Sequence, residues 1–299
     1  MRYTLRQLTY FVAASDHKSI SNAARALNVS QPSISNAIIQ LEKQYSVSLF
    51  LRRNSNGVRL TPSGELLLRE ARSILAHADD FEALATSVLN DVTGDIRVAC
   101  FVNIAPVYMA SITRQFQEKY PGTRVDMMIG NQQEVFNAID SGRYELGLTF
   151  DLDLPQDYRI DYFASFPPKL ILPASHRFAD RAEVPLTDML EEPFVYLDLP
   201  HSSRYFFSLF TSLGLQPQRT IPVASFETIR SFVGNELGFS ILNLMPQNKR
   251  NYDGTQVRYL PIAKTHRPLN LCAISLKRNI YRRSSLAFID HLKGFFSKT

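Results

Sequence analysis

Side chains that can read the edges of DNA bases gather in one short stretch, residues 30–36. The candidates in this stretch are Ser30, Gln31, Pro32, Ser33, Ser35 and Asn36. A glutamine or asparagine amide can pair with adenine through two hydrogen bonds, and hydroxyl groups can bond to bases or to phosphates. We expect the stretch to contact DNA if it opens an exposed helix.

Two arginines, Arg52 and Arg53, stand beside a turn predicted at 54–57, between β-prone segments at 47–51 and 58–60. This pattern predicts a small hairpin, or wing, whose arginines contact phosphates or enter the minor groove. The first sixty residues carry eight basic and two acidic side chains, a net +6, which leaves the other 239 at about −1. The asymmetry favours a polyanionic partner at this end of the chain, with chance charge on a solvated surface as the alternative.

Apolar residues at helical spacing predict the elements that would hold these side chains in place. A first helix begins near Leu5, a second is capped by Ser19, and a third is capped by Ser30. In the third, Ile34, Ile38 and Leu41 form an inward stripe, so the polar residues face outward. Two short helices joined by a tight turn are typical of a DNA-reading unit, although a plain helical bundle would show the same stripe.

The run 19–35, followed by Leu41-Glu42, Leu49-Phe50, Arg52-Arg53 and residues 60–65, resembles the LysR family of transcription regulators. The resemblance implies an N-terminal all-α winged helix-turn-helix with a long linker helix, and a C-terminal α/β two-lobed domain like periplasmic binding proteins. We expect the DNA-binding domain at 1–60, the linker or dimerisation helix at 61–93 and the effector-binding domain at 94–299. Within it, lobe 1 would cover about 94–157 and 267–299, and lobe 2 about 158–266. Asn36 departs from the arginine common in the family, which predicts a different base preference.

A long helix should begin at Pro62, capped by Thr61, and run to Asp91. Apolar residues repeat along it with spacings of four and three, the period of a coiled-coil seam. The seam consists of Leu67, Ala71, Ile74, Ala78, Phe81, Ala85 and Val88. The resemblance implies a homodimer through this helix, doubled to a homotetramer by the sensing domains, whereas packing onto its own domain is the alternative for the seam.

Beyond Gly94 the pattern alternates between strands and helices, which predicts a parallel sheet with covering helices. The expected strands lie at 96–100, 125–129, 146–150, 169–172, 194–197, 221–223 and 239–242. The expected helices include 104–120, 132–141, 203–214 and 227–235. The resemblance is looser here and implies that the chain crosses between lobes near 151–157 and returns near 263–268.

Ligands of open α/β sheets bind beyond the carboxyl ends of strands, where helices begin. The residues at those points are Cys100, Phe101, Val102, Asn103, Asn131, Thr149, Phe150, His201, Ser202, Ser203 and Phe226. The family often places Ser or Thr at the first of these turns to hold a carboxylate, and here Cys100, Phe101 and Val102 take its place. The sequence therefore predicts an effector that is less anionic, or more apolar, than the family's usual acids. His201 fits a surface residue equally well, and Cys100 fits a buried apolar residue better than a redox sensor.

The function predicted from the sequence is a transcription regulator that binds a double-stranded DNA operator and responds to a small-molecule metabolite. We expect no catalytic residues, cofactor, metal or membrane partner, and a cytoplasmic location, since Cys100 and Cys272 cannot form a disulfide framework and no apolar run could span a membrane. Phosphate-loop, nucleophile-elbow and zinc motifs are missing from the sequence. The alternatives are a ligand-independent DNA-binding protein and an enzyme on a solute-binding-protein-like fold.

Overall fold

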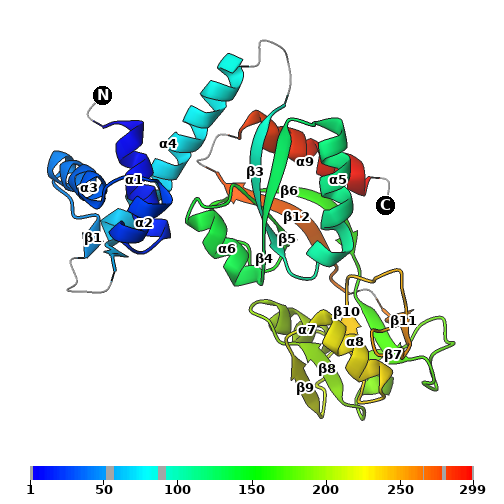
Figure 1. Ribbon diagram of the computed structural model, residues 1–299. Helices are drawn as coiled ribbons and strands as arrows, with labels where there is room; N and C mark the ends of the chain where they lie inside the picture. The colour runs from blue at the N-terminus through cyan, green and yellow to red at the C-terminus, as the bar shows by residue number, and fades with distance from the viewer. Residues whose placement is uncertain (1–2, 52–56, 87–91, 265, 278–280, 298–299) are drawn as a thin grey trace.

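The computed structural model of the chain describes residues 3–51, 57–86, 92–264, 266–277 and 281–297, without the side chains at 80 and 82–86. Three parts follow one another along the chain: a small helical domain, a long helix and a two-lobed α/β domain (Figure 1). No helix within these described ranges combines the length and apolarity that a membrane span needs.

The first part contains three helices and a two-stranded hairpin. Its elements are α1 (Leu5–Asp16), α2 (Ile20–Ala26), α3 (Gln31–Tyr45), β1 (Phe50–Leu51) and β2 (Arg59–Leu60). The helices begin at polar caps because a side-chain oxygen accepts a backbone N–H that has no partner within the helix. Ser19 accepts from Asn22 N–H and Ser30 from Ser33 N–H, both at 3.3 Å. The buried side chains of α1 and α3 then form one core, including Phe11, whose ring lies 5.6 Å from that of Phe50.

The wing is tied to the turn between α1 and α2 by its glycine. Gly57 has a positive φ of 95°, and a Cβ there would lie 2.7 Å from the carbonyl oxygen of Lys18. That close approach lets Val58 N–H donate to the same carbonyl oxygen at 3.0 Å. Only glycine fits this position without a backbone shift. Arg52 and Arg53, expected at the tip of the wing, lie outside the described residues.

The long helix α4 (Pro62–Thr86) begins where the sequence indicated, with Gly64 N–H donating to Thr61 Oγ1 at 2.9 Å. Its first half packs on its own domain: Ala71 is buried in the core of the first part, and Leu67 and Ile74 pack against that core. Ala78 is half-buried, whereas Phe81 is 72% exposed. The predicted seam is therefore divided, and the alternative of packing on the chain's own domain holds for its first half. The side chain of Ala85, and Val88, lie outside the described residues.

Lobe 1 is a five-stranded sheet in the order β4-β3-β5-β12-β6. Its strands are β3 (Gly94–Phe101), β4 (Thr123–Gly130), β5 (Leu146–Phe150), β6 (Tyr158–Phe166) and β12 (Leu269–Leu276). Its helices are η1 (Ala105–Met109), α5 (Ala110–Lys119), α6 (Gln132–Asp140) and α9 (Arg283–Phe296). β3 is parallel to β4 and β5, but β12 runs antiparallel to β5 and β6, so the sheet is mixed and the expectation of a wholly parallel sheet was wrong. Phe116 of α5 and Phe288 of α9 pack together on one face, and α6 covers the other.

Lobe 2 is built from one antiparallel sheet, one parallel strand pair and three helices. The strands are β7 (Lys169–Pro173), β8 (Phe194–Leu197), β9 (Thr220–Val223), β10 (Ser240–Leu242) and β11 (Val257–Pro261). The helices are η2 (Leu186–Met189), α7 (Ser202–Thr211) and α8 (Phe226–Gly234). β7 lies between β10 and β11, and β8 pairs with β9.

The chain passes between the two sheets twice, at neighbouring points. Because β6 belongs to the first sheet, the outward crossing lies at 167–168, between β6 and β7, and not at 151–157 as expected. Lobe 2 therefore starts after β6, and not at about 158 as expected. The return runs through 262–268, between β11 and β12. These paired crossings leave the carboxyl ends of β3 and β5 facing lobe 2 (Figure 1).

Candidate functional site

The first turns of α3 present polar side chains to solvent. Gln31 and Asn36 are exposed, and Ser35 is half-buried. Ile34, Ile38 and Leu41 are buried on the opposite side, as the inward stripe predicted. Ser30 and Ser33 are exposed too, but their hydroxyl oxygens lie 2.7 Å apart within the helix cap. The helix therefore offers two amides, and its own uncapped N–H groups, to a ligand in front of its N-terminus.

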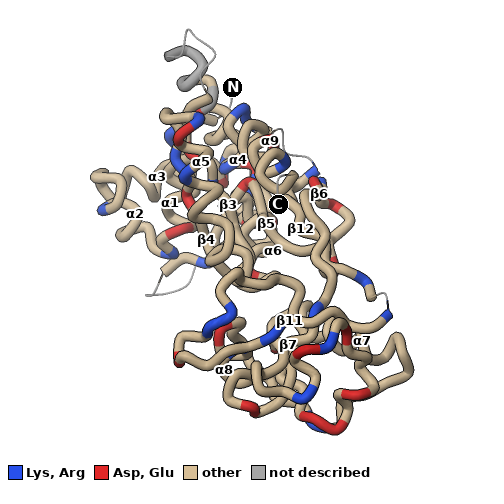
Figure 2. Tube along the Cα trace, turned by 90° about the vertical axis from the view of Figure 1, so that its right-hand side faces the viewer, with Lys and Arg blue, Asp and Glu red and all other residues tan. Residues whose placement is uncertain are grey.

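The charge on the surface agrees with a polyanionic partner for this part of the chain. Lys18 is exposed just before α2, Arg25 is exposed in its last turn, and Arg59 is exposed on β2. In lobe 2, by contrast, Figure 2 shows acidic and basic residues interspersed around β7, β11, α7 and α8. An excess of positive charge confined to one end would steer only that end toward phosphates.

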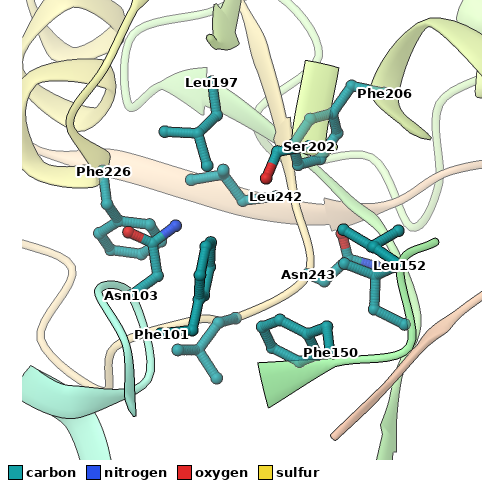
Figure 3. A pocket seen from close by; sticks show the side chains of 12 residues that line it. Phe101, Asn103, Phe150, Leu152, Leu197, Ser202, Phe206, Phe226, Leu242 and Asn243 are labelled. Atoms are coloured by element: carbon teal, nitrogen blue, oxygen red, sulfur yellow. The ribbon is translucent and has the colours of Figure 1, made fainter. Parts of the chain in front are cut away.

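A cavity lies between the two lobes of the α/β domain (Figure 3). Five of the residues predicted for an effector site line it, namely Phe101, Asn103, Phe150, Ser202 and Phe226. Seven further residues complete the lining, namely Leu152, Leu197, Phe206, Leu242, Asn243, Leu244 and Leu269. All twelve are uncharged, so in the described part of the chain this cavity has apolar walls and three polar side chains.

Two of the polar groups are open to a ligand. In Figure 3 the Ser202 hydroxyl and the Asn103 amide both face the cavity. Ser202 is the first residue of α7, and Asn103 follows β3, as the rule for open sheets predicted. Among the described residues, neither side chain has a hydrogen-bond partner. Each can both donate and accept.

The third polar residue, Asn243, was not predicted from the sequence. Its amide nitrogen donates to the carbonyl oxygen of Phe166 and to the hydroxyl of Tyr205, both at 2.8 Å. A carbonyl only accepts, so the nitrogen must face Phe166 and Oδ1 points elsewhere. That Oδ1 is buried and has no partner among the described residues. Asn243 directly follows β10, so the strand-end rule that found Asn103 could have found it as well.

Tyr205 holds Asn243 in this orientation. Its hydroxyl donates to the carbonyl oxygen of Arg267 at 2.8 Å, on the returning crossing of the chain. Burial raises the pKa of Tyr205 to about 12, which keeps the hydroxyl protonated and able to donate. Asn243 also reaches Phe166 at the end of β6, so the cavity is bonded to both crossings between the lobes.

The other predicted residues have different places. Cys100 is buried in β3 and Val102 is exposed, and neither lines the cavity. The Asn131 side chain caps α6 by accepting from Glu134 N–H at 3.0 Å. Ser203 is half-buried outside the cavity.

Thr149 acts on the cavity only through Gln132. Its hydroxyl donates to the side-chain oxygen of Gln132, which is buried at the start of α6. The amide nitrogen of Gln132 donates to the carbonyl oxygens of Phe150 and Leu152, at 3.1 and 3.0 Å. Gln132 therefore fixes the segment that carries two of the wall side chains.

His201 joins the two lobes beside the cavity. Its Nδ1 lies 2.9 Å from Asp153 Oδ2 and its Nε2 lies 3.2 Å from Gln133 Oε1, both on lobe 1. Its ring also packs edge-on against Phe136 of α6, at 5.4 Å between centroids. Arg204 adds a second ion pair to Asp153, at 3.2 Å. These contacts, which we name the latch, hold lobe 2 against lobe 1.

The cavity is tight in this arrangement. The volume open to the centre of a water molecule is about 20 Å³. A volume of roughly 10–15 Å³ on that measure holds a single water molecule. A larger molecule can therefore enter only if the lobes move apart or the side chains shift.

Comparison with known proteins places the whole chain in one family. Residues 5–65 match the family model described as the bacterial regulatory helix-turn-helix protein of the lysR family, and residues 90–297 match the LysR substrate binding domain. Together the two matches confirm the fold predicted from the sequence. The chain belongs to the LysR family of transcriptional regulators, with a DNA-binding helix-turn-helix and an effector-binding domain.

Individual relatives cover nearly the full chain. The uncharacterized HTH-type transcriptional regulator YnfL of Escherichia coli K12 is 30% identical over 270 residues, which are 88% of this chain and 89% of that protein. The crystal structure of HinK, a LysR family transcriptional regulator from Pseudomonas aeruginosa, is 35% identical with a TM-score of 0.68, covering 99% of this chain and 100% of that one. The hydrogen peroxide-inducible genes activator of Haemophilus influenzae is 26% identical over 97% of both chains.

Proposed function

We propose that this regulator binds a specific double-stranded operator through the N-terminal face of α3, and that an uncharged metabolite bound between its lobes controls that binding. It works in the cytoplasm, where its operator lies, as a homodimer that its sensing domains double to a homotetramer. The observation that carries the proposal is the cavity, whose walls come from both lobes. The side chains of Asn103 and Ser202 and the Oδ1 atom of Asn243 have no hydrogen-bond partner among the described residues. A molecule that fills the cavity interacts with both lobes at once.

The lining favours a neutral ligand. A charged group placed there would lose its water and meet no opposite charge among the lining residues, which is costly in an apolar setting. Asn243 Oδ1 is an acceptor that receives no hydrogen bond from the described part of the chain, so a ligand N–H or O–H group would satisfy it. The effector is therefore a largely apolar molecule with at least one hydrogen-bond donor, while Asn103 and Ser202 accommodate a donor or an acceptor.

Control of DNA binding requires that the ligand distinguish two arrangements of the lobes. A ligand shifts an equilibrium only through a difference in affinity between its states. Here the cavity is nearly closed, so closing the lobes around the ligand creates contacts that an open form lacks. Movement of the lobes would then shift the subunits that carry the reading helices.

On the DNA side, Gln31 and Asn36 contact base edges, with Pro32 and Ser35 beside them. Ser30 and Ser33 contribute through the start of α3, whose N–H groups face a phosphate. Arg52 and Arg53 contact phosphate or the minor groove.

We propose no catalytic activity for the chain. The cavity lining holds no acid, base or thiol that could act on a bound molecule. The name of the Haemophilus relative refers to hydrogen peroxide. A response to peroxide through a thiol does not suit this chain. Cys100 and Cys272 are both fully buried, and burial raises the pKa of both thiols, so little reactive thiolate forms. A regulator that binds no ligand is disfavoured, because the buried Oδ1 of Asn243 would then stay without a protein or ligand donor among the described residues.

A screen followed by operator binding tests the proposal. Thermal shift of the full-length protein against neutral, anionic and cationic metabolites should give hits among neutral donors. Ser202→Trp should remove the shift and the effect of the hit on operator affinity, because the indole fills the cavity. Ser203→Trp, one residue away and outside the cavity, is the matched control. The proposal fails if both variants respond like the wild type, or if the binding molecules are all charged.

A further inference from the structure

A second hollow lies between α4 and lobe 1, separate from the effector cavity. Its lining brings together four arginines, Arg69, Arg72, Arg97 and Arg282, with one carboxylate, Glu145. The arginines come from α4, β3 and the residue that precedes α9. The hollow is thus made jointly by the linker helix and the sensing domain.

Two of the arginines already have partners. Arg282 holds Glu145 with two hydrogen bonds of 2.8 and 2.9 Å, which neutralises the carboxylate of the lining. Arg72 is 5% exposed and pairs with Asp16 of α1, while its other nitrogen donates to the carbonyl oxygen of Ser141 at 2.5 Å. These two guanidinium groups are fixed in place by the fold.

Within the described ranges, the side chains of Arg69 and Arg97 have no such partners. Arg69 Nε is buried and makes no hydrogen bond among the described residues. The guanidinium group of Arg97 likewise forms no ion pair within the described ranges. Arg97 bonds to Glu145 only through its backbone, where its N–H donates to Glu145 Oε1 at 3.1 Å and its carbonyl oxygen accepts from Glu145 N–H at 3.2 Å. Burial lowers the pKa of Arg72, the paired Asp16 raises it, and the neighbouring cations Arg143 and Arg97 lower it. Positive charge is therefore crowded here beyond what the fold neutralises.

An anion is the simplest partner for this arrangement. The planar fork of a guanidinium group matches the paired oxygens of a phosphate or carboxylate, and such charge-assisted bonds are about twice as strong as neutral ones. The two unpaired guanidinium groups, of Arg69 and Arg97, come from different elements, so an ion with three or more oxygens can bond to both and is favoured over a halide. The exposed imidazole of His77, also in the lining, adds a donor at the rim.

We propose that this hollow binds a small multivalent oxyanion, inorganic phosphate or a phosphate monoester, between Arg69 of the linker helix and Arg97 of the sensing domain. The two parts touch at Gly142, whose positive φ of 66° favours glycine and where a Cβ would lie 3.5 Å from the Arg69 carbonyl oxygen, an ordinary contact distance. A bound anion bridges the DNA-binding half and the sensing half, and it stabilises the arrangement seen here. The site is independent of the effector proposed above.

Binding of inorganic phosphate to the full-length protein tests the site. The melting temperature is followed as phosphate replaces chloride at constant ionic strength, and isothermal titration gives the affinity. Phosphate should raise the melting temperature in a saturable way, as expected when a ligand binds only the folded state. Arg97→Gln and Arg69→Gln should each weaken phosphate binding about tenfold or more. Arg114→Gln, an exposed cation on α5 that pairs only with Glu118 in the described part, should leave binding unchanged.

The outcomes separate a built site from a general salt effect. Equal stabilisation of the wild type, Arg97→Gln and Arg114→Gln would overturn the proposal, as would the absence of saturable phosphate binding up to millimolar concentrations. A parallel titration with phenyl phosphate distinguishes the two sources of the anion. Tighter binding of phenyl phosphate identifies an ester as the ligand, and tighter binding of inorganic phosphate identifies the free ion. Neither result depends on an effector being found.

Discussion

At the scale of the residue, the polar side chains at 30–36 have two roles: some cap the start of α3, and others are exposed to a partner. The hydroxyl groups of Ser30 and Ser33 bond to each other and to the first turn, so they hold the helix start in shape. Gln31 and Asn36 are exposed and, among the described residues, have no partner to compete with DNA. Sequence specificity should therefore depend more on the two amides than on the serines.

Replacing Gln31 by Ala should lower operator affinity by roughly 1–3 kcal/mol at the base pairs it contacts, and little at other sequences. The measurement is a mobility-shift titration on the operator and on single-base variants of it. Gln40→Ala is the control, because it removes the same amide about 13 Å further along the helix axis, where Gln40 Oε1 accepts from Gln7 Nε2 at 2.9 Å. If the two variants lose the same affinity, or if Gln31→Ala keeps the wild-type base preference, the reading face is wrongly placed.

About half of the effector cavity could be predicted from single residues. Phe101, Asn103, Phe150, Ser202 and Phe226 line it because each lies at the end of a strand or the start of a helix. The same rule also selected Asn131 and Thr149, whose side chains turn to a cap and to Gln132. The leucine walls could not be predicted, since apolar residues at strand ends look the same whether they face the core or a cavity.

At the scale of the element, α4 combines the two interpretations that its heptad pattern allowed. The residues Leu67, Ala71 and Ile74 serve the core of the first part, and Leu67 and Ile74 also border an apolar hollow of about 240 Å³ with Leu8 and Leu41. Phe81 has no such cover. An exposed phenylalanine beyond a packed helical stripe is typical of a helix that pairs with a second copy of itself.

The substitution Phe81→Asp should dissociate the dimer, because it would bury an unpaired carboxylate in the helix pair. Sedimentation at micromolar concentration should show a shift from dimer or tetramer to smaller species, together with weaker operator binding. Phe81→Leu keeps the apolar contact and should keep the assembly. A wild type that sediments as a monomer, or a Phe81→Asp variant that assembles normally, contradicts the role given to α4.

Strands and helices could be predicted where the local sequence pattern determines them. They could not be predicted where the return of a distant segment to the sheet determines them. The strands expected at 169–172 and 194–197 match β7 and β8 within one residue. No strand was predicted for β6 or β12. In the structure β12 pairs with both β5 and β6, and β6 forms one edge of the lobe 1 sheet. Strand direction depends on how distant segments return to the sheet, and periodicity carries no information about it. That is why the mixed sheet and the later crossing were missed.

At the scale of the whole molecule, the lobes are joined by two crossings on one side and by the latch at His201 on the other. The crossings are covalent and bonded to Asn243 and Tyr205, so they act as the hinge. The latch depends on one carboxylate, Asp153, which contacts both His201 and Arg204. Loss of Asp153 removes the contacts to both His201 and Arg204 and leaves those of His201 with Gln133 and Phe136 in place, so it tests the charged part of the latch alone.

Asp153→Ala should shift the lobes toward an open arrangement. Both contacts of Asp153 are exposed to solvent, with exposed fractions of 41% for Asp153, 21% for His201 and 80% for Arg204, so each contributes about 0.2–1 kcal/mol. Effector affinity should therefore fall about two- to thirtyfold, because closing the lobes around the ligand costs more when both contacts are missing. Titration calorimetry with a hit from the screen measures this, and small-angle scattering without ligand should give a larger radius of gyration. Asp157→Ala, an exposed carboxylate on the same lobe, should change neither quantity. An Asp153→Ala variant that binds effector like the wild type and scatters identically would mean that the latch does not control closure, and that the hinge alone sets the distance between the lobes.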